Sequence, residues 1–531
     1  MKQSEVAGNT RSPRSFRQTV LSMLGLCFVL IMVALDQTVV GTALPTVVAE
    51  LNGFGLYAWV GTSYLLASVI VVPIFGKLGD EYGRKPFVIL AIVIFTLASM
   101  LCGMAHSMLQ LVLARALQGI GGGMLMATAF ACIPDLFPDT RERLRWQVMF
   151  STAFGLANAF GPSLGGYLTE FWGWRWVFFV NLPVGILSFI FVWQFLPRIR
   201  HSAQAPSRMD WLGAFLVALT LACLQLFVEW LTQHKPVALL TATGTIGIIS
   251  GIGLVWWERR CENPVLPLAM FKDKILGPVF ALSMAVSFCL FAIMYYAPLL
   301  FQGGFGLSPN QAGLLITPLA VFITVGSIIN GRIMTRLQSP HVVLYSGLGF
   351  FLLSAMLMTQ ATLTTPHAII VLAMMCGGLG IGLILPNLTL IVQSSALRNQ
   401  LGVATAMLQS MRMVGSMLGT AIIGSFISHQ YVSKVNHVLA ATHASQLTSW
   451  LDDPKILFSR ELSERFTKAM PKLEHDAMYF INSAQHALID AVHESQLLIA
   501  ALVILVFWLV YHIPKINVHQ HSKDKDIQIS H

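Results

Sequence analysis

Charged side chains are scarce in this sequence. Of its 531 residues, 11% are charged and 55% are hydrophobic, whereas a typical soluble domain has about 25% charged residues. A soluble protein of this composition would expose large apolar patches to water. Because apolar runs recur along nearly the whole chain, the composition indicates a polytopic membrane protein. The formal net charge of +9 is therefore interpreted loop by loop, and no nucleic-acid partner is expected.

Several kinds of site are also missing. The seven cysteines form neither a disulfide framework nor a metal-binding spacing, and all but Cys261 lie inside apolar runs, where packing is the expected role. The histidines of the C-terminal tail are too widely spaced to predict a metal site. There is no P-loop, and no cluster of His, Asp or Ser of the kind an integral-membrane enzyme needs. We therefore expect a protein that is not an enzyme, has no cofactor and does not use ATP.

Apolar segments long enough to cross a membrane, which takes about 20 residues, are abundant. The segment after Arg11, Arg14 and Arg17 is too long for a signal peptide, so we expect it to remain as the first helix. Fourteen spanning helices are predicted, near residues 19–44, 57–75, 87–105, 109–133, 147–169, 176–196, 211–232, 237–257, 276–300, 311–330, 341–361, 367–393, 402–428 and 497–513.

The basic residues predict the orientation of these helices. Most of the 33 lysines and arginines lie in the tails 1–18 and 514–531 and in the alternate connections on the same side. The short connections on the other side hold only Arg175 and Lys235. Both termini are therefore expected to be cytoplasmic. The external segment 430–496 is long enough to cross regardless of charge, and it is interpreted either as a lid over an outer opening or as an ordinary connector.

Two pairs of motifs indicate an internal repeat. GKLGDEYGRKP (76–86) matches GRIMTRLQSP (331–340), and LARALQGIGGG (113–123) matches LAMMCGGLGIG (372–382). The repeat predicts two six-helix bundles, 19–200 and 276–513, with a two-helix insert in 201–275. The halves differ in charge, because Arg115 aligns with Met374 and Asp36 has no acidic counterpart.

The same stretches resemble a known family. GKLGDEYGRK is similar to the cytoplasmic loop signature of the major facilitator superfamily, and GLANAFGPSLGGYL (155–168) resembles its antiporter motif. LDQTVVGTALP (35–45) resembles the first-helix signature of the fourteen-helix drug:proton antiporters of the QacA/EmrB type. The sequence departs from these patterns at Gly41 and Glu81. The resemblance implies an all-α major facilitator fold in the cytoplasmic (inner) membrane.

The function implied by this resemblance is secondary active transport. We expect a proton-coupled antiporter that exports lipophilic or cationic drugs by alternating access, driven by the proton gradient. An exporter of a dedicated metabolite, such as a siderophore, peptide or fatty acid, is the alternative; an uptake symporter or sensor fits the antiporter motif less well. The expected partners are a small-molecule substrate, protons and the lipid bilayer. The chain is expected to be a monomer, and recruitment of a periplasmic adaptor stays open.

Asp36 and Arg115 are the strongest candidate site residues. Counted at 1.5 Å per residue, Asp36 lies roughly 28 Å from the cytoplasmic edge and Arg115 roughly 9 Å from the outer face, which are comparable depths. Burial disfavours a charged carboxylate and a nearby arginine favours it, so such a group could load and release a proton. A static buried ion pair is the alternative. We also assign Thr38 and Gln118 to this proton-coupling site.

Three further groups are predicted. A cytoplasmic latch between the halves is assigned to Gly76, Asp80, Gly83, Arg84 and Lys85, with an ordinary charged loop as the alternative. The antiporter motif predicts a pliant, leak-proof seam built from Gly155, Gly161, Pro162, Gly165 and Gly166. Candidate cavity residues are Arg412, Asn181, Asn387 and Gln409. Trp172, Trp174 and Trp176 are interpreted as an outer aromatic belt.

Overall fold

The computed structural model describes residues 16–137, 140–197, 210–232, 236–261, 264–265, 268–334, 340–396, 401–458, 460–469 and 476–513. The regular structure in these ranges is helical, as the apolar composition predicts. In a bilayer a helix satisfies its own backbone hydrogen bonds, which no single strand can do. The side chains of Lys77, Asp80, Glu81 and Glu229 lie outside the described part of the structure.

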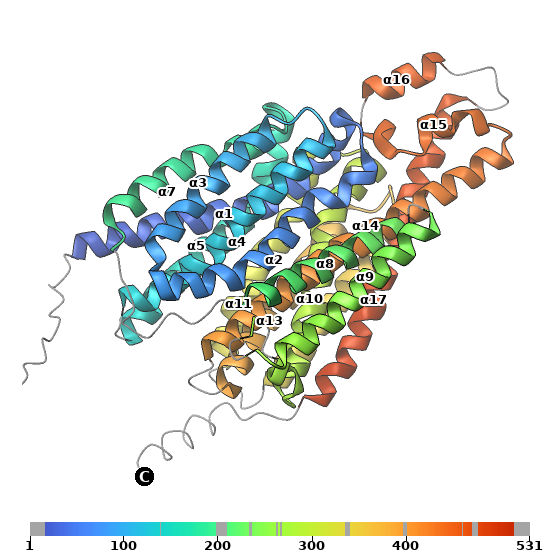
Figure 1. Ribbon diagram of the computed structural model, residues 1–531. Helices are drawn as coiled ribbons and strands as arrows, with labels where there is room; N and C mark the ends of the chain where they lie inside the picture. Colours follow the sequence, from blue (N-terminus) through green and yellow to red (C-terminus); the bar gives the residue numbers. More distant parts are fainter. Residues whose placement is uncertain are drawn as a thin grey trace, which may run out of the picture.

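The N-terminal half forms one bundle, seen at the left of Figure 1. Within it α1 packs against α5 and α7, and α4 packs against α2 and α3. Its helices are α1 (Phe16–Leu51), α2 (Tyr57–Tyr82), α3 (Arg84–Gly103), α4 (Met108–Leu136), α5 (Thr140–Phe171), α6 (Trp176–Phe179) and α7 (Asn181–Phe195), with a short 3₁₀ turn at Phe54–Leu56.

The C-terminal half forms the second bundle, in which α13 packs against α11 and α12, and α10 against α14. Its elements are α10 (Leu276–Leu299), the π-helical turn η3 (Leu300–Gly304), α11 (Pro309–Met334), α12 (Pro340–Thr359), α13 (His367–Ser395), α14 (Leu401–Ala441), α15 (Thr448–Leu451), η6 (Pro454–Leu457), α16 (Arg460–Ala469) and α17 (Ala477–His512). Two more 3₁₀ turns span Leu268–Lys272 and Ser445–Leu447.

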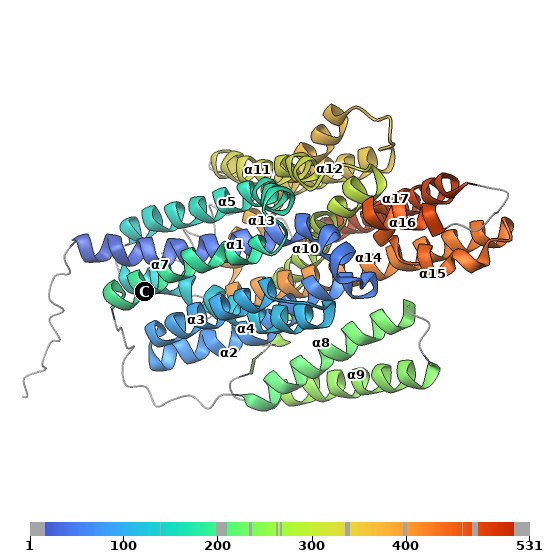
Figure 2. The ribbon, with the colours of Figure 1, turned by 90° about the horizontal axis from the view of Figure 1, so that it is seen from above.

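The insert consists of α8 (Trp211–Thr232) and α9 (Val237–Glu258). These helices form a pair at the edge of the molecule in Figure 2. The inner helix α8 contacts α2 of one half and α14 of the other. The outer helix α9 exposes large apolar side chains such as Ile248 and Ile252, as expected for a helix that faces lipid.

Thirteen helical segments in the described ranges are long and apolar enough to cross a membrane. The segment predicted at 147–169 is not among them; it lies in α5, which is 32 residues long and packs beside α1 and α11. The protein is therefore a multi-pass membrane protein. We call the end of the bundles where α1 begins the near end, and the end where α1 finishes at Leu51 the far end. The cap (α15, η6 and α16) lies at the far end (Figure 1).

Equivalent glycines make equivalent contacts in the two halves. A Cβ on Gly119 or Gly123 of α4 would strike backbone atoms of α2, and one on Gly121 would strike α3. In α13, Gly378 and Gly382 stand in the same way against α11, and Gly380 against α12. Since a side chain here would separate the helix pairs, the shared glycine spacing has a packing cause in both halves.

The halves are joined most visibly at the far end. The Gln302 Nε2 donates to the Thr42 carbonyl at 2.7 Å, and the Tyr57 hydroxyl donates to the Tyr295 carbonyl at 2.8 Å. The backbone N–H of Asn310 donates to Glu170 at 3.0 Å. Each of these bonds links α1, α2 or α5 to the opposite half, so the far end of the molecule is closed in this structure.

Two expectations differ from the structure. The helices predicted at 402–428 and 497–513 are longer, because α14 continues to Ala441 and α17 begins at Ala477; a helix keeps its hydrogen bonds beyond the apolar stretch that hydropathy detects. The helix predicted at 176–196 is confirmed as one segment, Trp176–Phe195, with a local irregularity at Val180, since Pro183 cannot donate to the Phe179 carbonyl. Trp174 is 1% exposed and therefore lies in the core instead of an outer belt.

Candidate functional site

The carboxylate of Asp36 lies deep within α1 and is buried, with 1% of the residue exposed. Its Oδ2 accepts a hydrogen bond from Arg115 Nη1 of α4 at 2.7 Å. The guanidinium is itself fully buried. A lone buried charge would be very costly, and this ion pair gives each of the two side chains a partner of opposite formal charge inside the bundle. The structure thus brings together the two residues that the sequence places at comparable depth.

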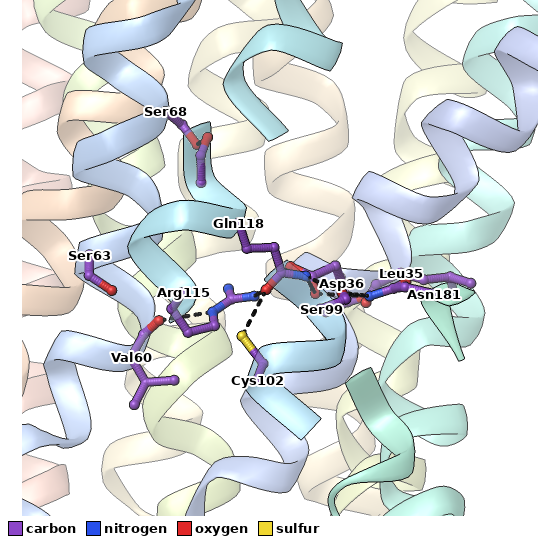
Figure 3. Close-up of polar contacts among 12 residues, drawn as sticks. Leu35, Asp36, Val60, Ser63, Ser68, Ser99, Cys102, Arg115, Gln118 and Asn181 are labelled. Carbon is purple, nitrogen blue, oxygen red and sulfur yellow. Dashed lines mark hydrogen bonds and ion pairs between the residues drawn. The ribbon is translucent and has the colours of Figure 1, made fainter. Parts of the chain in front are cut away.

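Polar side chains surround the other carboxylate oxygen (Figure 3). Asp36 Oδ1 accepts from Gln118 Nε2 at 2.7 Å and from Asn181 Nδ2 at 3.2 Å. Both amides also donate to the Ser99 hydroxyl, at 2.6 and 2.9 Å. Four helices (α1, α3, α4 and α7) therefore meet at a single carboxylate, and both of its oxygens have donors.

Arg115 has partners besides the carboxylate. Its Nε donates to the Val60 carbonyl of α2 at 3.1 Å, and its Nη1 also donates to Gln118 Oε1 at 2.7 Å. The guanidinium carbon lies 4.5 Å from the centre of the Tyr64 ring, within cation–π range. Nη2 has no hydrogen-bond partner within the described ranges. The guanidinium would therefore keep several favourable contacts if Asp36 became neutral.

The ion pair lies close to the boundary between the halves, because Arg115 bonds Val60 and the next residue of α2 contacts the opposite half. Gly61, next to Val60, faces the ring of Tyr295 of α10, whose Cε1 would be 2.6 Å from a Cβ at this position. The Tyr57 hydroxyl, one turn earlier in α2, bonds the Tyr295 carbonyl. A movement of Arg115 that displaced Val60 would consequently disturb a contact that ties the two halves together.

The glycines of the antiporter motif lie on two faces of α5. Gly161 and Gly165 face α1. A Cβ on Gly161 would overlap the Thr38 hydroxyl, and a Cβ on Gly165 would lie 2.6 Å from the Val39 carbonyl oxygen. Thr38 is buried and bonds backbone carbonyls of its own helix.

On the other face, Gly166 would strike the Pro309 carbonyl of α11, and the carbonyl of Pro162 stands against Gly313. Gly155 is looser, since its Cβ would lie 3.1 Å from Thr324 Oγ1. This close approach places the motif at the boundary between the halves; its role as a leak-proof seam stays a prediction.

The predicted latch is described in part. Gly83 separates α2 from α3 with φ of 88°, a conformation that favours glycine. Lys85 Nζ donates to the Trp193 carbonyl at 2.7 Å, a contact with α7 of its own half. A Cβ on Gly76 would meet nothing within 4 Å, and Arg84 lies beside Gly79. The side chain of Asp80 lies outside the described residues, so the latch stays a prediction.

The candidate cavity residues fall into three places. Asn181 belongs to the shell of Asp36 described above. Asn387 of α13 is buried and donates to Asn330 of α11 at 2.8 Å. Arg412 and Gln409 meet in α14, where Arg412 Nη1 donates to Gln409 Oε1 at 2.8 Å.

Some partners in these networks were not anticipated. Ser99 joins two amides beside Asp36, and the Val60 carbonyl holds Arg115. In the other half, Ser283 and Thr389 accept from Arg412. A serine or threonine in an apolar helix usually bonds its own backbone, and a carbonyl carries no sequence signal, so neither type of partner stands out in the sequence.

The comparisons with known proteins agree with this architecture. A model of the major facilitator superfamily matches residues 26–420. The chain belongs to the major facilitator superfamily. Two relatives from Bacillus subtilis (strain 168) cover most of the chain: the multidrug transporter protein MdtP is 30% identical over 91% of each chain. Multidrug resistance protein 3 is 31% identical over 87% of this chain and 90% of its own length.

Solved structures of the superfamily show the same fold. A bacterial homologue of the human lysosomal transporter Spinster, in an inward-facing and unoccupied conformation, superimposes with a TM-score of 0.65. The match has 13% sequence identity and covers 94% of this chain and 98% of that chain. As a member of the major facilitator superfamily, the protein is a multi-pass transporter of the cell membrane and not an enzyme.

Proposed function

We propose that this transporter is a proton-coupled antiporter that exports lipophilic compounds, cationic drugs among them, by alternating access. The observation that carries the proposal is the fully buried Asp36–Arg115 pair. Ionisable residues inside membrane helices are expensive and are usually functional. Two relatives at about 30% identity, named as a multidrug transporter and a multidrug resistance protein, support export as the direction and drugs as the cargo.

Opposing effects on Asp36 make it suited to proton exchange. Burial disfavours its charged form, whereas Arg115 at 2.7 Å and two amide donors favour it. Separation of the carboxylate from the guanidinium would therefore favour proton uptake, and restoring the contact would favour release. Arg115 can tolerate the separated state because Val60, Gln118 and Tyr64 still contact it.

The position of the pair supports coupling to alternating access. Arg115 reaches the boundary between the halves through Val60 and its neighbour Gly61, which faces Tyr295. Protonation and rearrangement at the boundary would thus bias the same two conformations, which is what coupling requires. The gradient is sufficient: one charge moved through 100 mV is worth about 2.3 kcal/mol, and each pH unit adds about 1.4 kcal/mol.

The topology completes the proposal. With α5 counted as a spanning helix the chain has fourteen, an even number, so both termini are on one side of the membrane. The excess of lysine and arginine in the tails and alternate loops supports the cytoplasmic side, and the far end then faces the outside of the cell. The closed far end then corresponds to an inward-facing state. The protein works as a monomer in the bilayer, and small-molecule cargo and protons are its ligands.

A dedicated metabolite is the second candidate for the cargo. Arg412 favours it, since this cation within α14 has only neutral partners in the described structure. A fatty acid or acidic peptide would bring the anion that this arginine lacks, which a purely cationic drug would not.

The test is efflux of a lipophilic dye cation from energised vesicles, with and without a compound that collapses the proton gradient. The parent should export the dye only while the gradient is present. Asp36→Asn should lower export to the level of vesicles that lack the protein, because the amide cannot exchange a proton. The matched control is Glu50→Gln, the same chemical change in the same helix, at a half-exposed carboxylate that bonds Arg175 and Trp174 near the far end.

Glu50→Gln should retain gradient-dependent export. Unchanged export by Asp36→Asn would reduce the Asp36–Arg115 pair to helix packing and would contradict proton coupling at this site. Export by the parent that survives gradient collapse would contradict antiport itself.

A further inference from the structure

Arg412 differs from the other deeply placed arginine in the chemistry of its partners. Its Nε donates to the Ser283 hydroxyl at 3.2 Å, and its Nη2 donates to the Leu385 carbonyl and the Thr389 hydroxyl at 2.8 and 2.9 Å. Its Nη1 donates to Gln409 Oε1 at 2.8 Å. None of these four acceptors carries a formal charge. Within the described ranges the guanidinium therefore has no counter-ion, and one N–H of Nη1 has no acceptor.

The guanidinium is directed toward the interior of the protein. Gly419 lies seven residues further along α14, on nearly the same helix face, and packs against the Phe288 carbonyl of α10. Val403 lies nine residues earlier, on the opposite face, and is 47% exposed, as expected for a residue facing lipid. Arg412 as a whole residue is nevertheless partly exposed.

Arg412 is linked to the boundary between the halves through α10, which contacts α1. Its partners come from α10 and α13, and α10 lies next to α1 of the N-terminal half in Figure 2. The Met294 carbonyl of α10 is 3.1 Å from the position of a Cβ on Gly41 of α1. Arg412 is eleven residues from the start of α14, or about 16 Å from the near end at 1.5 Å per residue. This depth is about half of the roughly 30 Å hydrocarbon core, the level at which transporters built from repeats bind their substrates.

The carboxylate of Asp36, close to the boundary, already has a partner of opposite charge. Asp36 is buried, paired with Arg115 and bonded by two amides, so a cation could bind it only by displacing Arg115. The charge that these two sites present to an incoming compound is therefore positive. Moreover, Gln409 supplies a neutral acceptor on a partly exposed side chain, which a carboxylate could replace while gaining a charge-assisted bond.

We propose that Arg412 is a cargo-binding residue that recognises a carboxylate carried by a lipophilic compound. This inference rests on the proposed export function and specifies its cargo: an apolar body with one acidic group, held by the Nη1 edge of the guanidinium. Ser283 and Thr389 are positioning residues that fix the orientation of the guanidinium. Cationic cargo would use the same route without contacting Arg412.

The test uses three probes with one apolar body: 1-naphthylacetate, 2-(1-naphthyl)ethanol and 2-(1-naphthyl)ethylamine. Binding is measured by equilibrium dialysis with the full-length protein in nanodiscs at pH 7, where the acid is ionised. The acid should bind roughly tenfold more tightly than the alcohol, because a charge-assisted hydrogen bond replaces a neutral one. Arg412→Gln should abolish this preference and leave the alcohol unchanged.

Two control variants keep the test decisive if Arg412→Gln folds poorly. Ser283→Ala loosens the guanidinium but retains the charge, so the preference for the acid should shrink without disappearing. Arg175→Gln makes the same charge change near the far end, beside Glu50, and should retain the full preference. Equal binding of acid and alcohol by the parent would overturn the inference, as would an equal loss of all three probes in Arg412→Gln. Displacement of the acid by an equal concentration of inorganic sulfate would overturn the assignment to a lipophilic carboxylate.

This test is separable from that of proton coupling. Asp36→Asn should lose gradient-dependent export and still bind the acid in preference to the alcohol. Acid preference in a protein that shows no proton coupling would support the Arg412 inference and contradict the proposed antiport. Proton-coupled dye export by a protein that binds acid and alcohol equally would support the proposed antiport and contradict the Arg412 inference.

Discussion

The two arginines inside the bundles, Arg115 and Arg412, illustrate two ways to keep a cation away from water. Arg115 in the N-terminal half is fully buried and has a carboxylate at 2.7 Å. Arg412 in the C-terminal half is partly exposed and has only neutral acceptors within the described ranges. In our proposal the carboxylate of the buried ion pair gains and loses a proton during transport. Arg412, which lacks a counter-ion in the described structure, would receive one from the cargo.

The repeat makes this difference informative. The glycines of α4 and α13 make corresponding contacts with neighbouring helices, so the two halves share their backbone packing. Yet Met374, fully buried, stands where the sequence alignment of the halves places Arg115. The shared packing was retained while the chemistry diverged, which assigns proton coupling to one half and cargo recognition to the other in our proposal.

The largest effect on stability is expected when Arg115 is replaced by methionine, the residue at the equivalent position of the C-terminal half. Arg115→Met would leave Asp36 buried without its cation, and breaking a buried pair typically costs about 3–5 kcal/mol. The thermal unfolding midpoint in detergent should fall strongly. The double variant Asp36→Asn/Arg115→Met should recover much of this stability, since no charge is stranded, but should not recover gradient-dependent export. A double variant as unstable as Arg115→Met would contradict the role given to the pair.

An intermediate effect is expected at the seam between α5 and α11. Gly166→Ala would push a methyl group into the Pro309 carbonyl, and overpacking of this kind costs about 1–3 kcal/mol. Because the strain falls on the closed far end, export should drop by roughly tenfold. Gly155→Ala, whose Cβ would lie 3.1 Å from a threonine hydroxyl, is the matched control and should stay near the parent rate. Equal export by the two variants would show that the seam does not limit closure.

The smallest effect is expected on stability at Arg412. Arg412→Gln strands no carboxylate, so its unfolding midpoint should change far less than that of Arg115→Met, by the equivalent of about 1 kcal/mol for lost hydrogen bonds to neutral groups. The same thermal measurement on both variants tests the comparison directly. A loss as large as that of Arg115→Met would imply a structural role for Arg412 that its hydrogen bonds to neutral groups do not account for.

Much of the fold could be predicted from sequence, because a membrane helix is recognised by the length of its apolar run and the repeat by its matching glycines. The contact between Asp36 and Arg115 could be anticipated because a helix has a fixed rise per residue, so sequence position gives depth. The ends of α14 and α17 could not be predicted, because helical hydrogen bonding continues where hydropathy falls. Trp174 was grouped with Trp172 and Trp176, which are exposed, but its indole N–H bonds Glu50 and its ring packs against Phe178, contacts that the sequence does not reveal.

The site was less predictable than the fold. Ser99 and the Val60 carbonyl complete the network around Asp36 and Arg115, but their roles depend on the angle at which α2 and α3 approach α4. Sequence spacing fixes positions along a helix and carries no information on such angles. The neutral surroundings of Arg412 are likewise a property of three helices meeting, which no single segment reveals.

Proton movement during export is the measurement that tests the central claim most directly. The purified protein would be reconstituted in liposomes that enclose a pH-sensitive dye, and an outward or inward gradient of cargo would be imposed without a pH gradient. The parent should move protons opposite to the cargo, and Asp36→Asn should move none while Glu50→Gln behaves as the parent. Proton movement of undiminished size in Asp36→Asn would contradict the assignment of coupling to the Asp36–Arg115 pair.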